Sequence, residues 1–146
     1  MTRELRDCLG HFATGVTVVT SEIDGQKHGA TVNSFTAVSL DPPLVLVSLD
    51  RTSKAGRHLG DRPFVVNVLK EGQSDLAMHF AGRPTARPIR WDGTKLAEAL
   101  AHIVCEPWRS YDGGDHVLFL GRVKEIGTSQ GDPLLFYRGA FTKRGA

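Results

Sequence analysis

Runs of β-branched and apolar residues recur along the first half of the chain and predict short strands. They lie at residues 16–20, 29–32, 44–49 and 63–69, and such residues are typical of strands. Asp24 and Gly25 are a signal for a tight hairpin that returns the chain into a strand over residues 28–34. Pro42 and Pro43 impose a turn before residues 44–49, because proline fixes φ. We therefore expect a series of strands joined by tight turns.

The second half continues the strand pattern. Residues 117–123 are an almost continuous apolar run, and residues 133–141 are again strand-like. The letters YDGGD at residues 111–115 predict a glycine turn that delivers His116 to the start of the 117–123 strand. Residues 96–105 have helical propensity, although HIVC before Pro107 is equally compatible with a strand, so we expect a helical turn followed by a strand.

Helical signals are few and short. The spacing i, i+3, i+4, i+7 of an amphipathic helix is met by Leu5, Cys8, Leu9 and Phe12, with Thr2 placed to cap this helix and Gly15 to end it. We expect this helix to cover one mouth of the sheet. Residues 73–80 predict a second helix, whose inward-facing residues are Leu76, Ala77 and Phe80.

Residues 50–60 predict a third short helix, which Thr52 or Ser53 can cap and Gly60 can stop. Free backbone N–H groups and the helix dipole favour a phosphate at such a start. Taken together, six or seven short strands with few helices predict a mainly β fold, a closed or nearly closed β-barrel. With 146 residues, 40% of them hydrophobic, the chain is expected to form one domain over residues 1–146.

Composition excludes several classes of function. The formal net charge is only +2 and charged residues make up 23%, so we expect neither nucleic acid nor a membrane surface as a partner. Cys8 and Cys105 lie far apart without a CxxC pair, which suits free, buried thiols in a reducing compartment. The polar N-terminus and the lack of a membrane-spanning apolar run predict a cytoplasmic protein.

Common catalytic motifs are absent or out of context. The letters GTSQG at residues 127–131 match a nucleophile pattern, but Asp132 and Pro133 follow, which favours a surface turn over a strand-to-helix elbow around Ser129. The six histidines lack HxH or HExxH spacing, so no metal site is expected. No GxGxxG or P-loop pattern follows a strand.

The remaining chemistry is a set of uncharged donors beside a cationic helix start. Amide and hydroxyl groups gather around the turn at residues 41–43, from Asn33, Ser34, Thr36, Ser39 and Ser48. Lys54 stands at the predicted helix start. This set lacks a nucleophile with its base, but suits a cofactor that carries its own reactivity, as flavins do.

The chain resembles the short-chain flavin reductases with an FMN-binding split barrel, the reductase halves of two-component flavin monooxygenases. The matching stretches occur in family order: FATGVTVVT (12–20), HGATVNSFTAVSLDPPLVLVSLD (28–50), FVVNVL (64–69), GGDHVLFLGRV (113–123) and PLLFYRGAF (133–141). The resemblance implies a split β-barrel of Greek-key type. It also implies a homodimer that binds FMN or FAD at each subunit interface, is reduced by NADH or NADPH, and passes reduced flavin to a separate monooxygenase.

Site residues follow from the resemblance by position. Thr31, Val32, Asn33 and Ser34 would line the flavin ring and ribityl chain, Ser48, Leu49 and Asp50 would close the opposite side, and Thr52, Ser53 and Lys54 would face the phosphate. His116 matches the family histidine beside the nicotinamide and is the candidate catalytic residue. No metal is implied.

Simpler interpretations stand beside these roles. Asn33 and Ser34 could satisfy local backbone groups at a strand end, and residues 52–54 could cap the helix as well as bind phosphate. Arg83, Arg87 and Arg90 fit a solvated loop, with pyrophosphate binding as the alternative. For the whole protein, two further hypotheses are an electron-carrier module that retains its flavin without nicotinamide-dependent turnover, and a dimeric scaffold without flavin affinity.

Overall fold

The structure is a computed structural model that describes residues 2–146. Its helices are α1 (Thr2–Leu9), α2 (Lys54–His58) and α3 (Ser74–His79), with a 3₁₀ turn at Leu59–Asp61 after α2. Its strands are β1 (Thr14–Gly15), β2 (Thr17–Ile23), β3 (Gln26–Val32), β4 (Thr36–Leu40), β5 (Pro43–Asp50), β6 (Phe64–Val68), β7 (Trp91–Asp92), β8 (Lys95–Leu96), β9 (Ala101–Gly113), β10 (His116–Thr128), β11 (Leu134–Tyr137) and β12 (Ala140–Lys143). The predicted mainly β fold is confirmed.

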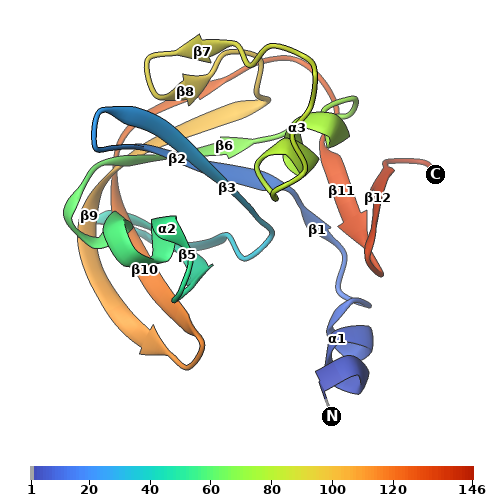
Figure 1. The fold of residues 1–146 in the computed structure, drawn as a ribbon, viewed down its shortest axis with the longest axis horizontal. Coiled ribbons are helices and arrows are strands. Elements are labelled where there is room, and N and C mark those ends of the chain that lie inside the picture. The colour runs from blue at the N-terminus through green and yellow to red at the C-terminus, as the bar shows by residue number, and fades with distance from the viewer. Residues whose placement is uncertain (1) are drawn as a thin grey trace.

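One antiparallel sheet carries most of the strands (Figure 1). Within residues 2–146 its order is β3-β2-β6-β9-β10-β5-β4, beside a small sheet β1-β11-β12 and the pair β7-β8. The large sheet curls, so that strands from both of its halves contribute side chains to one core. Val19 of β2, Val47 of β5, Val66 of β6 and Phe119 of β10 all belong to that core. The arrangement is the predicted split barrel. Its two edge strands, β3 and β4, are not paired with each other within the described residues.

A second core covers the other face of the sheet. Successive side chains of a strand point to opposite faces, and Val18 accordingly packs with Leu69, Ala77 and Leu134 while Val19 packs in the barrel. Ala77 of α3 is fully buried here, and Leu76 and Phe80 are partly buried. The predicted inward face of this helix is therefore confirmed, and α3 holds the sheet from outside.

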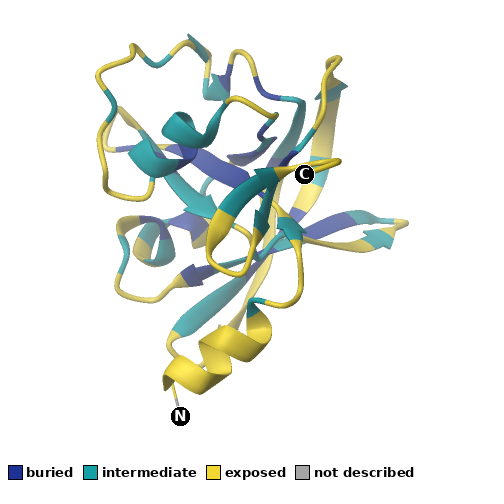
Figure 2. Cartoon of the chain, turned by 90° about the vertical axis from the view of Figure 1, so that its right-hand side faces the viewer, coloured by how far each residue is buried: buried dark blue, intermediate teal, exposed yellow. Residues whose placement is uncertain are grey.

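The first helix departs from the prediction. It ends at Leu9, and Gly15 lies in β1 instead of stopping the helix. It leaves its apolar face uncovered by the rest of the chain, since Leu5 is 51%, Leu9 63% and Phe12 79% exposed. Figures 1 and 2 show α1 as an arm that extends from the body. Amphipathic spacing indicates that a helix buries one face, but it does not say against what.

Three further differences concern strands. Residues 36–40 form β4, where only a polar flank of the turn was predicted, and β9 reaches Gly113, which restricts the glycine turn to Gly114 and Asp115. Residues 133–141 are not one strand: Arg138 (φ 51°) and Gly139 (φ 79°) make a hairpin between β11 and β12. β4 and the last residues of β9 are largely exposed, so they lack the apolar alternation from which strands are recognised.

Local turn and cap signals are confirmed. Asp24 (φ 52°) and Gly25 (φ 76°) form the β2–β3 hairpin. Ser53 caps α2, its hydroxyl accepting from Gly56 N at 3.0 Å. Ser129 sits after the end of β10 with its hydroxyl donating to Ala99 O at 3.0 Å, in no strand-to-helix elbow.

The two cysteines differ from each other. Cys105 is buried, as expected, and burial raises the pKa of its thiol to about 12. Cys8 is exposed on α1, against expectation, because the arm does not fold back onto the sheet. Among the helices of residues 2–146, none has the length and apolar character needed to cross a membrane.

Candidate functional site

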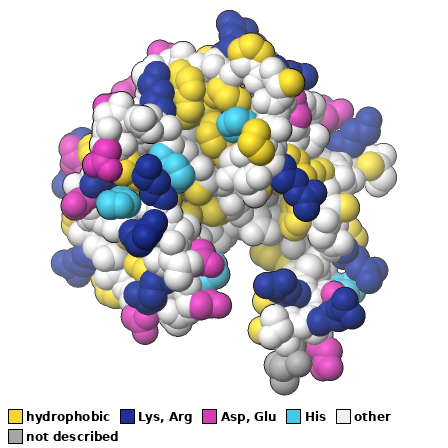
Figure 3. Space-filling view, in the orientation of Figure 1, with side chains coloured by type: hydrophobic (Ala, Val, Ile, Leu, Met, Phe, Trp, Pro, Cys, Tyr) yellow, Lys and Arg dark blue, Asp and Glu magenta, His cyan; other side chains and the backbone are white. Residues whose placement is uncertain are grey.

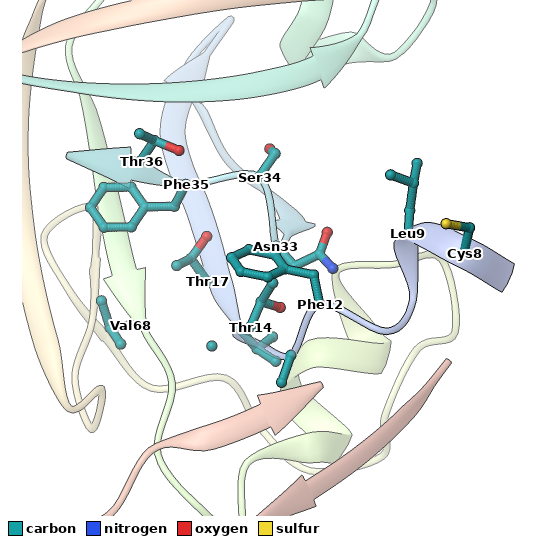
Figure 4. A pocket seen from close by; sticks show the side chains of 13 residues that line it. Cys8, Leu9, Phe12, Thr14, Thr17, Asn33, Ser34, Phe35, Thr36 and Val68 are labelled. Atoms are coloured by element: carbon teal, nitrogen blue, oxygen red, sulfur yellow. The ribbon is translucent and has the colours of Figure 1, made fainter. Parts of the chain in front are cut away.

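A groove of about 840 Å³ opens between the α1 arm and the end of the barrel. Its walls come from α1 and the chain that follows it, from the β3–β4 connection, and from Val68 at the end of β6 (Figure 4). Figure 3 shows the molecule hollowed beside the arm. The volume lies within the range of pockets for small molecules and cofactors. Phe12, Val16 and Phe35 supply apolar surface for a flat ring.

Asn33 is the predicted residue that the structure leaves most available. It is exposed at the end of β3 and lines this groove. Ser34, next to it, is already engaged: its hydroxyl donates to Ser48 O at 2.8 Å and accepts from Ser48 N at 3.1 Å. Ser34 therefore fastens the β3–β4 connection onto β5, and Asn33 is held in place by its neighbour.

Thr14 gives the groove an unsatisfied polar atom. Its Oγ1 is buried and has no hydrogen-bond partner within residues 2–146, whereas Thr17 in the same wall donates to Val32 O at 3.0 Å. Unpaired buried polar groups are rare in folded proteins and often mark sites completed by a ligand or water. A wall of apolar rings, one free amide and one unpaired hydroxyl fits a flat ligand rich in heteroatoms, such as a flavin.

Two other predicted residues do not line this groove and have structural contacts instead. Thr31 donates from its hydroxyl to Ala77 O at 2.6 Å and so ties β3 to α3. Leu49 is only 2% exposed and packs in the barrel core. Its side chain cannot reach a ligand, because alternation along β5 points Leu49 inward and Ser48 and Asp50 outward. Val32 is half-buried against the same core.

The predicted phosphate residues form a tight turn between β5 and α2. Asp50 Oδ1 accepts from Thr52 Oγ1 at 2.7 Å and from Thr52 N at 2.8 Å, and the side-chain bond is the main reason why the pKa of Asp50 lies below its ordinary value. The Ser53 hydroxyl donates to Asp50 O at 2.7 Å while it caps α2. Both hydroxyls are thus engaged within the turn, and the exposed Lys54 carries the positive charge.

Positive charge also gathers behind this turn. His28 of β3 is partly buried, and its pKa lies below the ordinary value because of burial, then the charge of Lys54, then that of His58. Lys54 and His58 are one turn apart on α2. The two smaller causes, the charges of Lys54 and His58, place positive charge beside this turn, and such charge favours an anion bound nearby.

His116 lies at the start of β10, directly opposite Asp50 in the β5–β10 ladder. Its Nδ1 is 2.7 Å from Asp115 Oδ1, a contact that orients the ring. Arg51 fastens the loop: its Nε donates to Gly114 O at 3.1 Å and its Nη2 to His116 O at 3.2 Å. The outer face of β5 and β10 thus brings together Ser48, Asp50 and His116, beside the Ser34 contact.

Sequence reasoning missed the part of the groove contributed by residues 12–17. Phe12, Thr14 and Thr17 line it, although the segment was interpreted only as a helix end and a strand. A phenylalanine followed by threonines between the predicted helix and the predicted strand was the available signal. Within residues 2–146, no three His, Cys, Asp or Glu side chains are grouped so that they could hold a metal ion.

Comparisons with known proteins give a consistent result. Residues 9–145 match the family model described as "Flavin reductase like domain". An NADH-dependent flavin reductase of a Rhodococcus species is 41% identical over 94% of this chain and 83% of that protein. The reductase component of a 4-nitrophenol 4-monooxygenase/4-nitrocatechol 2-monooxygenase of Rhodococcus opacus is 40% identical over 94% of this chain and 78% of that protein.

Solved structures agree with these relatives. The flavin reductase PheA2 in its native state superposes with a TM-score of 0.93, at 38% identity, over 100% of this chain and 99% of that one. The NADH:FAD oxidoreductase SgcE6 of Streptomyces globisporus C-1027, in complex with NAD and FAD fragments, gives a TM-score of 0.89 at 37% identity, covering 99% of this chain and 93% of that one.

Proposed function

This chain belongs to the family of flavin reductase-like domains, and from that membership we propose that it is an NAD(P)H-dependent flavin reductase acting on FMN or FAD. The observation that supports this most strongly is the 41% identity with an NADH-dependent flavin reductase over 94% of the chain. The groove beside Asn33, with its apolar rings and unpaired Thr14 hydroxyl, supports it independently. A bound flavin supplies the hydride acceptor and the reduced nicotinamide supplies the hydride.

In this proposal the protein acts by positioning its ligands. Asn33 donates to the ring system from the groove wall, with Thr31, Val32 and Ser34 forming the strand end that carries it. Ser48 and Asp50, with the backbone of Leu49, close the other side. Thr52 and Ser53 shape the turn that faces the phosphate through their bonds to Asp50, and Lys54, at the start of α2, presents its ammonium group to the phosphate. Well-oriented reactants need little further help from side chains.

His116 is the proposed catalytic residue. The ring is held by Asp115 at one nitrogen, so the other nitrogen is directed away from the loop. From there it can donate to the nicotinamide carboxamide or to the reacting ring system.

The exposed arm supports a homodimer with flavin bound near the subunit interface. Leu5, Leu9 and Phe12 are more than half exposed, and a contiguous apolar face of this kind marks an interaction surface. Leu9→Glu is expected to convert dimers to monomers in sedimentation, while Ile126→Glu, which changes an exposed apolar residue on β10, should leave them intact. A wild-type protein that sediments as a monomer would remove the dimer from the proposal.

We further propose that the chain folds as one domain in the cytoplasm and supplies reduced flavin to a separate monooxygenase. β2 contributes to both cores, which supports a single domain. The relative from Rhodococcus opacus is a reductase component of such a monooxygenase. Reduced flavin that leaves this protein would be consumed by the oxygenase.

Loss of absorbance by reduced nicotinamide provides the test. Purified protein is mixed with FMN or FAD and with NADH or NADPH, and oxidation of the nicotinamide is followed with and without flavin. Flavin-dependent oxidation with at least one donor is expected. A protein that keeps flavin through gel filtration, yet leaves it oxidised in excess NADH and NADPH, would instead be an electron carrier.

A further inference from the structure

The hairpin tip, residues 112–116, carries His116 at an end of the sheet where strand pairing runs out. β9 pairs with β6 only as far as Cys105, so within residues 2–146 its later residues pair with β10 alone. β10 in turn pairs with β5 only as far as His116, opposite Asp50. Figure 1 shows this end of the β9–β10 pair projecting from the body. A projecting end of a sheet is locally mobile unless other contacts hold it.

Arg51 makes four hydrogen bonds to the hairpin tip. Its backbone N donates to Asp115 O at 2.9 Å. Its guanidinium donates from Nε to Gly114 O at 3.1 Å, and from Nη2 both to His116 O at 3.2 Å and to the carboxylate of Asp112. The rigid, planar fork of arginine can meet several acceptors at once, which the single nitrogen of a lysine cannot.

The bonds to backbone oxygens matter more than the ion pair. The side chains of Arg51 and Asp112 are 48% and 83% exposed, and ion pairs in such a setting contribute little. The bonds to carbonyl oxygens, by contrast, fix the chain itself. Asp115 receives the bond from Arg51 N at its carbonyl, and its carboxylate contacts His116 Nδ1 at 2.7 Å. Asp115 therefore orients the ring, while Arg51 sets where the ring lies.

We propose that Arg51 is a positioning residue, which holds the hairpin tip against the turn after β5 and so keeps the His116 imidazole in one place. Arg51 acts through the backbone of the tip and needs no contact with the reacting atoms. A misplacement of about 1 Å can cost a large factor in rate, so a loosened tip impairs catalysis even when its histidine is intact. This catalytic consequence rests on the proposed function, whereas the restraint on the tip does not.

Steady-state kinetics test the consequence. Arg51→Met keeps the aliphatic stem but removes the guanidinium, and should lower kcat about fivefold with the flavin Kd nearly unchanged, because Lys54 remains at the start of α2. Arg51→Lys keeps the charge and should lose nearly as much. Arg109→Met is the matched control, since it removes an exposed arginine of β9 that stands over Trp108, and should keep the wild-type kcat.

A wild-type kcat in Arg51→Met or in Arg51→Lys would overturn the proposal, as would an equal loss in Arg109→Met. A double-mutant cycle tests whether Arg51 acts through the histidine. In a His116→Ala background, Arg51→Met should cause no further loss of kcat, because residues that act as a unit are not additive. Losses that multiply would mean that Arg51 acts on the ligands directly, and would overturn the positioning role.

NMR relaxation of the flavin-free protein tests the restraint without turnover. The order parameter of the His116 amide should be near the rigid value of about 0.85 in the wild type and clearly lower in Arg51→Met. The amide of Val19, in the barrel core, is the internal reference and should not change. Equal order at His116 in both proteins would overturn the proposal. A wild type that oxidises no nicotinamide, although Arg51→Met loosens the tip, would defeat the proposed function alone.

Discussion

His116 lies opposite Asp50 in the β5–β10 ladder, so the candidate catalytic ring and the turn expected to bind phosphate share one edge of the sheet. The ring is held from its own loop, through Asp115, and not by the turn. Catalysis and flavin binding are therefore expected to be separable by substitution.

His116→Ala should lower kcat about tenfold or more, the range expected for a lost positioning or proton-transferring group, with the flavin Kd nearly unchanged. Asp115→Ala should cause a smaller loss, because the imidazole remains but is no longer oriented. Steady-state kinetics and a fluorescence titration with flavin measure the two quantities. Parallel losses of kcat and affinity in His116→Ala would contradict the assignment.

Two asparagines, Asn33 just after β3 and Asn67 within β6, should give opposite phenotypes. Asn33 is exposed on the groove, whereas Asn67 of β6 is fully buried, its Nδ2 donating to Val18 O at 2.8 Å and its Oδ1 accepting from Leu96 N at 2.9 Å. Asn67→Ala leaves buried partners unpaired and should lower the free energy of unfolding by about 3 kcal/mol.

Asn33→Ala should leave unfolding within about 0.5 kcal/mol of the wild type, as for other surface substitutions, and weaken flavin binding about tenfold, equivalent to about 1.4 kcal/mol. Urea unfolding and flavin titration of both variants provide the comparison. An Asn33→Ala protein with unchanged flavin affinity would remove this residue from the proposed site.

These contrasts show why only part of the fold could be predicted. The Asp24–Gly25 hairpin and the Ser53 cap were predicted because their signals lie within a few residues. The exposure of the apolar face of α1 could not be predicted, since the spacing of apolar residues within a helix does not say what covers them. β4 has exposed, mixed residues and is recognisable as a strand only through its pairing with β5.

For the site, the sequence indicates which donors exist, but not which are already used. The hydroxyl of Thr31 is taken by Ala77, 46 positions away, and that of Ser34 by Ser48, 14 positions away. Such contacts follow from tertiary structure. The ion pairs of Arg87 with Asp75 and of Arg90 with Glu98 have the same origin, because these residues come together only in the folded chain.

Lys54→Met should raise the pKa of His28 towards its ordinary value of about 6.5 but leave it below, because burial, the larger cause, remains. Lys27→Met, a lysine on the same strand that stands over Trp91, is the control and should not shift it. Two-dimensional NMR titration of the imidazole reports the pKa. A shift produced equally by both substitutions would contradict a specific effect of Lys54.

The same lowered pKa predicts how stability depends on pH. Below a pH of about 6.5 the unfolded chain binds more protons at His28 than the folded chain does. Stability of the wild type should therefore fall, relative to His28→Gln, as the pH drops from about 6.5 towards the folded-state pKa, and the difference should then level off. Denaturant unfolding at several pH values measures it. A stability difference between the wild type and His28→Gln that instead develops above pH 7 would contradict a lowered pKa of His28.

Thr14 and Thr17 line the same groove and differ in one respect, which makes them a matched pair. Thr14 Oγ1 is buried without a partner within residues 2–146, whereas Thr17 Oγ1 donates to Val32 O at 3.0 Å. Valine has nearly the same shape as threonine but no hydroxyl. Thr14→Val should therefore raise the free energy of unfolding of the flavin-free protein by about 1 kcal/mol, and Thr17→Val should lower it by about the same amount. Thermal and urea unfolding of the flavin-free variants give both values, and changes of the same sign would contradict the contrast between the two hydroxyls.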